Sequence, residues 1–338
     1  MHIQKKIHFS FKYQALDLNK FCEIFLPALH KKQQDIQKKS TRLVHYCRAE
    51  AAKSILEKNK FWMRNSKCMN DYQEMQHGLK CLVKAWGGKD NPTPLKTIID
   101  EIFPSLTSKI EDNFNGWSTS FESGTFISCF SEHDNDEDEL GRLSMWRGYG
   151  KSVGVAIVMN NEPFFSGDDD WNGIYTHHVE YQGDEGVKKQ LDTIAENIKQ
   201  NKDYVESLGA DFVFDSIFIM LRLIMACTKH PGFKEEKEWR VIYSPEFDEN
   251  TAITKEIEVI NSTPQEVYKI PLKTDKNETD DKGKIKTAIL MSELIDRIII
   301  GPAEHPVAVR NAFIALLKRA NIPNAESKVF ISQIPLRT

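Results

Sequence analysis

Short strand-like runs recur along the whole chain, and the helical segments between them differ in length. Runs of apolar, β-branched and aromatic residues predict strands. Helices of unequal length are not typical of a doubly wound fold, in which strands and helices alternate regularly. The sequence therefore predicts an α+β fold with a mixed, split β-sheet core and flanking helices. The runs are LVHYC, FWMRNSK, TFISCFS, SVGVAIVM, HHVEYQ, WRVIYSP, VYKIPL, DRIIIGP and KVFISQI.

The N-terminal part of the chain is expected to form a helix docked on this domain and followed by a linker. Apolar residues, among them Phe21 and Phe25, recur at helical spacing and predict a helix over residues 14–39. The polar run KKQQDIQKKS at its end is expected to be a solvated linker. We therefore divide the chain into an N-terminal helical extension with its linker, residues 1–40, and a single α+β domain, residues 41–338. In an alternative interpretation, the extension regulates the protein or contacts nucleic acid.

Longer helices are predicted over residues 75–110 and 187–228. The second region ends in the most apolar segment of the chain, FVFDSIFIMLRLIMAC. This segment is interrupted by Asp215 and Arg222, and it is shorter than the roughly 20 residues that a membrane-spanning helix needs. It is expected to be a buried helix, and no membrane contact is predicted.

The net charge and the spacing of the cysteines limit the partners and the cellular location that we expect for this protein. The chain has 338 residues, with 45 Lys and Arg against 49 Asp and Glu, so its net charge is −4. Such a balance gives no global field toward nucleic acid or membranes, and any nucleic-acid contact must be local. The cysteines are scattered without a CxxC pair, and no signal-peptide pattern begins the chain, which favours a reducing, cytoplasmic location.

The run KEEKEWRVIY carries the strongest indication of a site. Glu236, Glu238 and Arg240 alternate into a strand, and side chains two residues apart on a strand share a face. In LVHYC, His45 and Tyr46 would point to opposite faces, and the two strands together suggest a shared cleft. The alternative is structural: the acids form exposed ion pairs, and His45 is a hydrogen-bonded core histidine.

The glycines around Tyr149 do not complete a known nucleotide-binding motif. GYGKS resembles the end of a P-loop, but Met145 stands where that motif needs a glycine, and a strand rather than a helix follows. The spacing required by the dinucleotide fingerprint is also missing. No His and Cys set has zinc spacing, and the acidic loop EHDNDEDE lacks the glycine of a calcium loop, so no metal ligand is assigned.

Several weak motifs occur in an order that resembles a known family. They are HY, MND, SCFSE, MWRGYG, GVAI, VEY, EKEWR and IIIGP, and they span roughly residues 42–302. This set is similar to the bacterial domain-of-unknown-function family twenty-nine seventy-one. That family resembles, more distantly, the ADP-ribosyltransferase fold, in which an early histidine or arginine, a middle serine or tyrosine and a late glutamate bind NAD.

The resemblance implies an ADP-ribosyltransferase-like fold and assigns roles to residues of this chain. His45 would be the early residue, Tyr149 or Ser66 the middle one, and Glu238 the late glutamate, while Glu236 would serve the acceptor. A carboxylate near the ribose stabilises the oxocarbenium-like state in which nicotinamide leaves. The residues expected to bind NAD are His45, Tyr46, Arg64, Ser66, Trp146, Tyr149 and Arg240.

The function implied by the resemblance is an NAD-dependent ADP-ribosyltransferase, with NAD as its substrate and a nucleic acid or a protein as acceptor. The same resemblance suggests an intracellular toxin or phage-defence effector, with a neutralising antitoxin protein that contacts the polar linker or the charged loop near Asp275. Two alternatives stay open. One is a magnesium-dependent nuclease using Glu236, Glu238 and Asp71, and the other is a sensor or interaction module without enzymatic activity.

Overall fold

The computed structural model describes residues 17–69, 73–88, 92–150, 153–165, 174–248, 250, 252–260, 262–274 and 289–335. The helices are α2 Leu18–Phe25, α3 Pro27–Lys39, α4 Ala49–Lys58, α5 Glu74–Trp86, α6 Pro94–Ile102, α7 Leu106–Gly124, α8 Leu143–Met145, α9 Asp184–Gln200, α10 Lys202–Leu208, α11 Ala210–Cys227, α12 Met291–Leu294 and α13 Pro306–Arg319. The strands are β1 Arg42–Arg48, β2 Lys60–Asn65, β3 Phe126–His133, β4 Gly154–Met159, β5 Ile174–His178, β6 Glu180–Tyr181, β7 Thr228–Lys229, β8 Glu238–Tyr243, β9 Thr254–Ile260, β10 Thr263–Lys273, β11 Ile289–Leu290, β12 Ile295–Ile300 and β13 Val329–Ile331.

A mixed, open sheet organises the fold. Within the described residues it has 11 strands, in the order β11-β10-β2-β3-β1-β4-β12-β13, with β9 beside β10 and with β8 and then β5 attached to β3. Most neighbours are antiparallel, whereas β10 with β11 and β12 with β13 are parallel. The short strands β6 and β7 pair separately. The predicted α+β class, with a mixed sheet and flanking helices, is confirmed, while the ADP-ribosyltransferase-like character stays a prediction.

The sheet divides at β3. Along one edge, β3 pairs with β8 from Phe126 to Ser131. The other edge is shared, because β2 pairs with Phe126 and Ile127 while β1 pairs with residues 131–133. The segment 128–130 therefore faces a gap between β1 and β2, which we call the fork.

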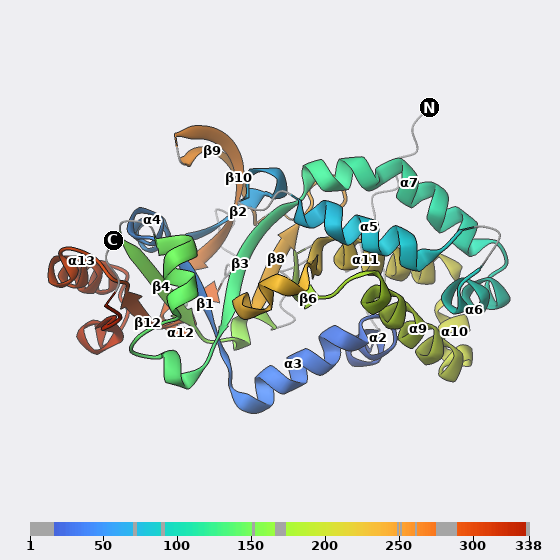
Figure 1. Cartoon of the computed structure of the whole chain (residues 1–338), viewed down its shortest axis with the longest axis horizontal. Coiled ribbons are helices and arrows are strands. Elements are labelled where there is room, and N and C mark those ends of the chain that lie inside the picture. Colours follow the sequence, from blue (N-terminus) through green and yellow to red (C-terminus); the bar gives the residue numbers. More distant parts are fainter. Residues whose placement is uncertain are drawn as a thin grey trace, which may run out of the picture.

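Helices cover both faces of the sheet (Figure 1). Buried side chains of α2, α5, α6, α7, α9, α10 and α11 pack together and against Ile127 of β3 and Ile242 of β8. We call this side the helical face. On the opposite face, α3, α4 and α13 pack against Phe130 and Trp239 of the same two strands. The predicted buried helix is α11, in which Arg222 is 4% exposed and pairs with Asp248 at 2.6 Å.

The N-terminal helix differs from its prediction. Within residues 17–39, two helices replace the single one, because Pro27 has no amide hydrogen and disfavours a helical Leu26, whose φ is −132°. The polar run expected to be a linker forms the second half of α3, where Ile36 is buried. Strand β9 and helix α13 were not predicted from the sequence. The charged loop near Asp275 lies outside the described residues.

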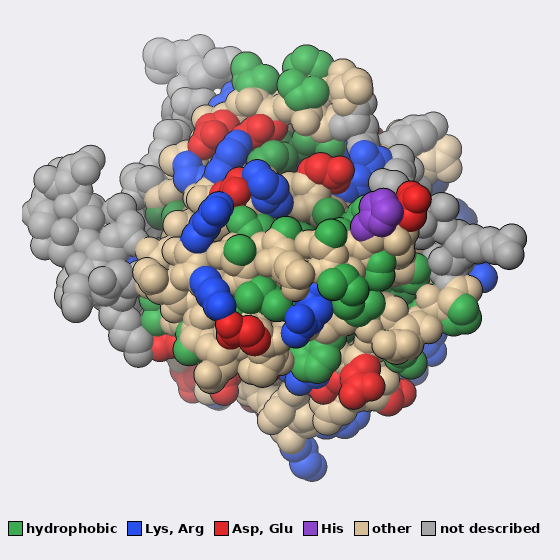
Figure 2. Space-filling view, turned by 90° about the vertical axis from the view of Figure 1, so that its left-hand side faces the viewer, with side chains coloured by type: hydrophobic (Ala, Val, Ile, Leu, Met, Phe, Trp, Pro, Cys, Tyr) green, Lys and Arg blue, Asp and Glu red, His purple; other side chains and the backbone are tan. Residues whose placement is uncertain are grey.

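The surface chemistry agrees with the balanced charge. Figure 2 shows the face at the left of Figure 1, where α13 lies, and basic and acidic side chains are interspersed on it. Such mixing leaves no extended field of one sign on this face. Among the described residues, no helix combines the length and the apolar character needed to cross a membrane.

We predict that Gly78→Ala destabilises the protein by about 2–3 kcal/mol, because overpacking a core forces the backbone to move. Gly78 lies where α5 crosses α11, and an added Cβ would stand 2.1 Å from the Met225 carbonyl oxygen. The matched control is Gly116→Ala in α7, where nothing lies within 4 Å and where alanine is expected to stabilise the helix. Chemical denaturation of both variants measures the difference; equal stabilities would contradict the close packing.

Candidate functional site

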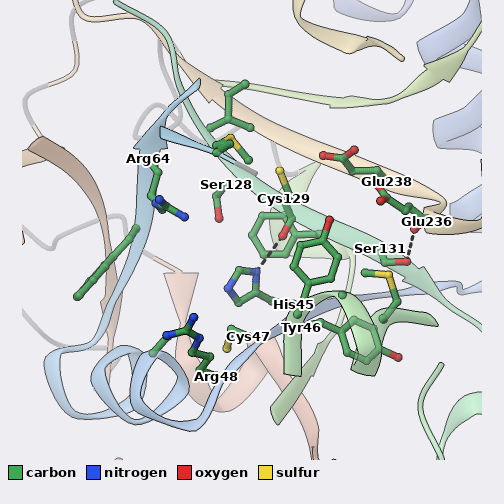
Figure 3. Close-up of a pocket in the computed structure, with 18 of the residues that line it drawn as sticks. His45, Tyr46, Cys47, Arg48, Arg64, Ser128, Cys129, Ser131, Glu236 and Glu238 are labelled. Atoms are coloured by element: carbon green, nitrogen blue, oxygen red, sulfur yellow. Dashed lines mark hydrogen bonds between the residues drawn. The ribbon is translucent and has the colours of Figure 1, made fainter. Parts of the chain in front are cut away.

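A pocket opens where the sheet divides. Its volume is about 670 Å³, within the about 300–1,000 Å³ typical of small-molecule sites. The strands β1, β2 and β3, the start of α4, the end of β9 and the segment before β8 contribute its walls. Figure 3 shows arginines at one end and two glutamates at the other, with His45 between them. The pocket therefore has a cationic end and an acidic end.

Strand alternation fixes which side chains meet on the helical face. Val44 pairs with Ser131, and Ser131 pairs with Glu238, so these three side chains share this face. Tyr46 and Arg48 follow Val44 at two-residue steps on β1 and point the same way. On β2, Arg64 pairs with Ile127 and joins the same face. His45 and Cys47 of β1 and Ser128 and Phe130 of β3 lie on the opposite face, and they enter the pocket at the fork.

His45 closes part of the fork. Its Nδ1 lies 2.8 Å from the carbonyl oxygen of Cys129, so Nδ1 must carry the donated hydrogen. The ring packs against Phe61 and Phe130. Burial lowers the pKa of His45, although the bond to Cys129 opposes the shift. The imidazole is therefore neutral at pH 7, and Nε2 is an acceptor.

The acidic end is a network of charges on the helical face. The Lys229 Nζ of β7 lies 2.5 Å from Glu74, 2.7 Å from Glu236 and 3.3 Å from Glu238. Arg240 pairs with Glu238 at 2.9 Å and also with Glu74. The network contains three carboxylates and two cations, and four of its members line the pocket while Arg240 lies behind them.

The two acids of KEEKE have pKa values shifted in opposite directions. Burial raises the pKa of Glu238, but Arg240 and Lys229 outweigh it and hold this pKa well below its usual range. Burial raises the pKa of Glu236 above its usual value despite Lys229. Divergent pKa values in neighbouring acids are typical of acid–base sites. Glu238 is suited to remain a carboxylate, and Glu236 is suited to exchange a proton.

Glu236 does not lie on the predicted strand. It ends a 3₁₀ helix, Pro231–Glu236, and Lys237 then adopts a left-handed conformation with φ 45° before β8 begins at Glu238. Arg142 holds this turn by donating to the Glu235 carbonyl at 3.1 Å, and Ser131 donates to the Glu236 carbonyl at 2.5 Å. The shared face is thus confirmed for Glu238 and Arg240 only, whereas Glu236 reaches the network through a turn.

The structure brings most of the predicted residues together. His45, Tyr46, Arg64, Tyr149, Glu236 and Glu238 line the pocket. The Tyr46 hydroxyl accepts a hydrogen bond from the Arg142 amide at 2.8 Å. Burial raises the pKa of Tyr149, so this phenol stays protonated at neutral pH.

Three predicted residues do not line the pocket. Ser66 is buried and donates to the Glu122 carbonyl, and Arg240 supports Glu238 from behind. Trp146 is 2% exposed and donates to the Leu140 carbonyl at 2.9 Å. Its ring fills the space beside Gly301, where a Cβ would come within 2.8 Å of it. Trp146 is thus a packing residue in this structure, away from the cavity expected to hold the nicotinamide.

Sequence reasoning missed Arg48, Glu74, Ser128, Cys129 and Lys229, all of which line the pocket. Ser128 and Cys129 belong to the SCFSE motif, and that motif was the available signal for them. Glu74 and Lys229 had no such signal, because only the tertiary fold brings them to the acids. The Cys129 thiol lies beside Glu238. Burial and this carboxylate both raise the pKa of the thiol.

A metal centre receives no support from the geometry. No group of three or more His, Cys, Asp or Glu side chains in the described part of the chain could hold a metal ion. Asp71, the third ligand in the nuclease alternative, lies outside the described residues. Lys229 already contacts the carboxylates of Glu236 and Glu238.

We predict that Lys229→Met lowers the free energy of unfolding at pH 7 by about 3 kcal/mol or more, because breaking a buried ion pair leaves charge uncompensated. Glu238 has a depressed pKa, so its contribution is present above the ordinary Glu pKa of about 4.3 and is lost as pH falls through the folded-state value. The deficit of the variant should therefore shrink as the pH falls from about 4.3 toward about 2, and it should be clearly smaller at about pH 3.

Denaturation at both pH values measures this dependence. The control is Lys188→Met, which removes an exposed pair with Asp192 and should cost less than about 1 kcal/mol at either pH. A deficit of Lys229→Met that is equal at both pH values would contradict the charge network.

Comparison with known proteins agrees with part of the sequence analysis. Neither the curated proteins nor the solved structures contain a match to this chain. Residues 145–241, which include Tyr149, Lys229, Glu236 and Glu238, match the model of a family described as protein of unknown function, DUF2971, and this match supports the predicted relationship over that segment.

Proposed function

We propose that this protein is an NAD-dependent ADP-ribosyltransferase whose reaction takes place at the acidic end of the pocket. The observation that carries the proposal is the pair Glu236 and Glu238, which line one cavity with pKa values shifted in opposite directions. An ionised acid beside an acid that can exchange a proton suits the transfer of a sugar from a leaving group to an acceptor.

Glu238 supplies the negative charge. When the bond between C1 of the ribose and the nicotinamide nitrogen breaks, the electron pair leaves with nicotinamide and positive charge develops on the ribose. A fixed carboxylate beside C1 stabilises that state because it is already oriented in a low-dielectric site. Arg240 and Lys229 fix Glu238 in this position through contacts of 2.9 and 3.3 Å.

Glu236 acts on the acceptor. The acceptor forms the new bond to C1 and loses a proton, which the Glu236 carboxylate takes up. Its side chain is 21% exposed, whereas that of Glu238 is 7% exposed, so Glu236 is the acid that an incoming acceptor reaches first.

The remaining walls suit the rest of NAD. Arg48 and Arg64 supply guanidinium groups for the pyrophosphate at the cationic end, and Arg pairs well with phosphate oxygens. Tyr149 offers an aromatic ring for the nicotinamide, and His45 offers Nε2 to a ribose hydroxyl. We propose a nucleic acid or a protein as acceptor. A toxin or phage-defence role, with an antitoxin partner, rests on the family resemblance alone.

We predict that Glu238→Gln lowers nicotinamide release from labelled NAD by about 100-fold or more, because it removes the charge that stabilises the transition state. Glutamine keeps the shape of the side chain but removes a charge from the buried network, so the thermal unfolding midpoint, measured alongside, is expected to fall, and release is assayed at a temperature at which the variant is folded. Glu180→Gln is the matched control, since Glu180 is also partly buried and contacts a basic side chain, His178 at 2.6 Å, but lies outside the pocket. Wild-type protein that releases no nicotinamide in the presence of nucleic acid and lysate proteins would refute the function.

We predict that Glu236→Gln reduces labelling of the acceptor more than it reduces nicotinamide release, because a general base contributes about 100-fold or more to proton removal. The raised pKa of Glu236 makes wild-type acceptor labelling increase as pH rises through a value above the ordinary Glu pKa of about 4.3. The variant should lose that pH dependence. Equal losses of labelling and release would contradict the assigned role.

A further inference from the structure

The middle of β3 carries a polar group that the reaction above does not use. Ser128 lines the pocket and is 3% exposed. Its Oγ has no hydrogen-bond partner among the described residues. Burying a hydroxyl without a partner costs free energy, and buried polar groups in native proteins nearly always have one. A partner supplied by a ligand would explain why this position holds serine.

Ser128 stands at the fork, between two residues that also face the pocket. Arg64 of β2 pairs with Ile127, one residue before Ser128. His45 of β1 bonds the carbonyl of Cys129, one residue after it. Figure 3 shows the Ser128 side chain pointing into the space between Arg64 and His45. The hydroxyl therefore faces the cavity from a rigid strand, with a second polar group close by.

The hydrogen-bonding chemistry of Ser128 and His45 determines which ligand group fits between them. The Nδ1 hydrogen of His45 is donated to Cys129, which leaves a lone pair on Nε2. Burial keeps the ring neutral by lowering its pKa. A phosphate oxygen has no proton to donate to such a nitrogen, whereas a sugar hydroxyl can donate to Nε2 and accept from the Ser128 hydroxyl. A hydroxyl thus complements both groups at once.

We propose that Ser128 and His45 form a subsite for a ribose hydroxyl, and that it receives the ribose attached to nicotinamide. The assignment to that ribose rests on the proposed function, which places its C1 beside Glu238. Cys129 connects the two positions, because its carbonyl binds His45 and its thiol adjoins Glu238.

Calorimetric binding of ADP-ribose and of ADP tests the subsite, since the two probes differ by the terminal ribose. Ser128→Ala should weaken ADP-ribose binding roughly tenfold, the equivalent of one hydrogen bond, and should leave ADP binding unchanged. Ser54→Ala is the matched control, because the Ser54 hydroxyl also lacks a partner in the described part of the chain but lies outside the pocket. It should change neither affinity.

Thermal unfolding separates a binding role from a structural one. Because the Ser128 hydroxyl has no partner within the described chain, Ser128→Ala without ligand should leave the unfolding midpoint unchanged or higher. A lower midpoint with unchanged ADP-ribose affinity would overturn the proposal. The proposal would also be overturned if Ser128→Ala weakened the binding of ADP-ribose and of ADP equally. The same holds if the wild-type protein did not bind ADP-ribose. Wild-type binding of ADP-ribose without nicotinamide release would refute the transferase function alone and leave the subsite to be judged by Ser128→Ala.

Discussion

The site depends on how β3 pairs with its neighbours. A strand in the middle of a sheet normally uses both edges, yet one edge of β3 is shared by the end of β2 and the start of β1. Backbone groups left between two such strands need other partners. The Cys129 carbonyl finds one in His45, whose ring packs on Phe130. The hydrogen bond that gives the Cys129 carbonyl a partner in this gap also places the His45 imidazole in the pocket.

The charge network joins the helical layer to this sheet. Glu74 comes from α5, Lys229 from the strand that follows α11, and Arg240 from β8. Removing such groups from water is costly, and only close pairing offsets the cost. Arg240 adds a bond to the Ala226 carbonyl, which ties the end of α11 to the same cluster. The acidic end of the pocket therefore cannot move without disturbing the contact between α5, α11 and the sheet.

Local patterns predicted the strands of the site, because two-residue alternation is a property of the backbone. This alternation placed His45 and Tyr46 on opposite faces and Glu238 with Arg240 on one face. The turn at Lys237 could not be predicted, since a left-handed lysine depends on the contacts around it. Lys229 was missed for a similar reason: only the packing of α11 brings it to the acids. Trp146 was misassigned because an aromatic beside glycines suits stacking on a ligand as well as packing in a core.

Glu236 is held from both of its ends, and this distinguishes it from an ordinary surface acid. Its carbonyl accepts a hydrogen bond from Ser131, and its carboxylate contacts Lys229. Arg142 supports the same turn through the Glu235 carbonyl while Glu137 balances its charge. A side chain fixed in this way loses little entropy when it binds a substrate, and its protonation changes with only small movement. A raised pKa weakens a purely structural ion pair, whereas it brings the pKa of Glu236 closer to that of an effective general base. The combination of a fixed backbone and a raised pKa supports the role proposed for Glu236.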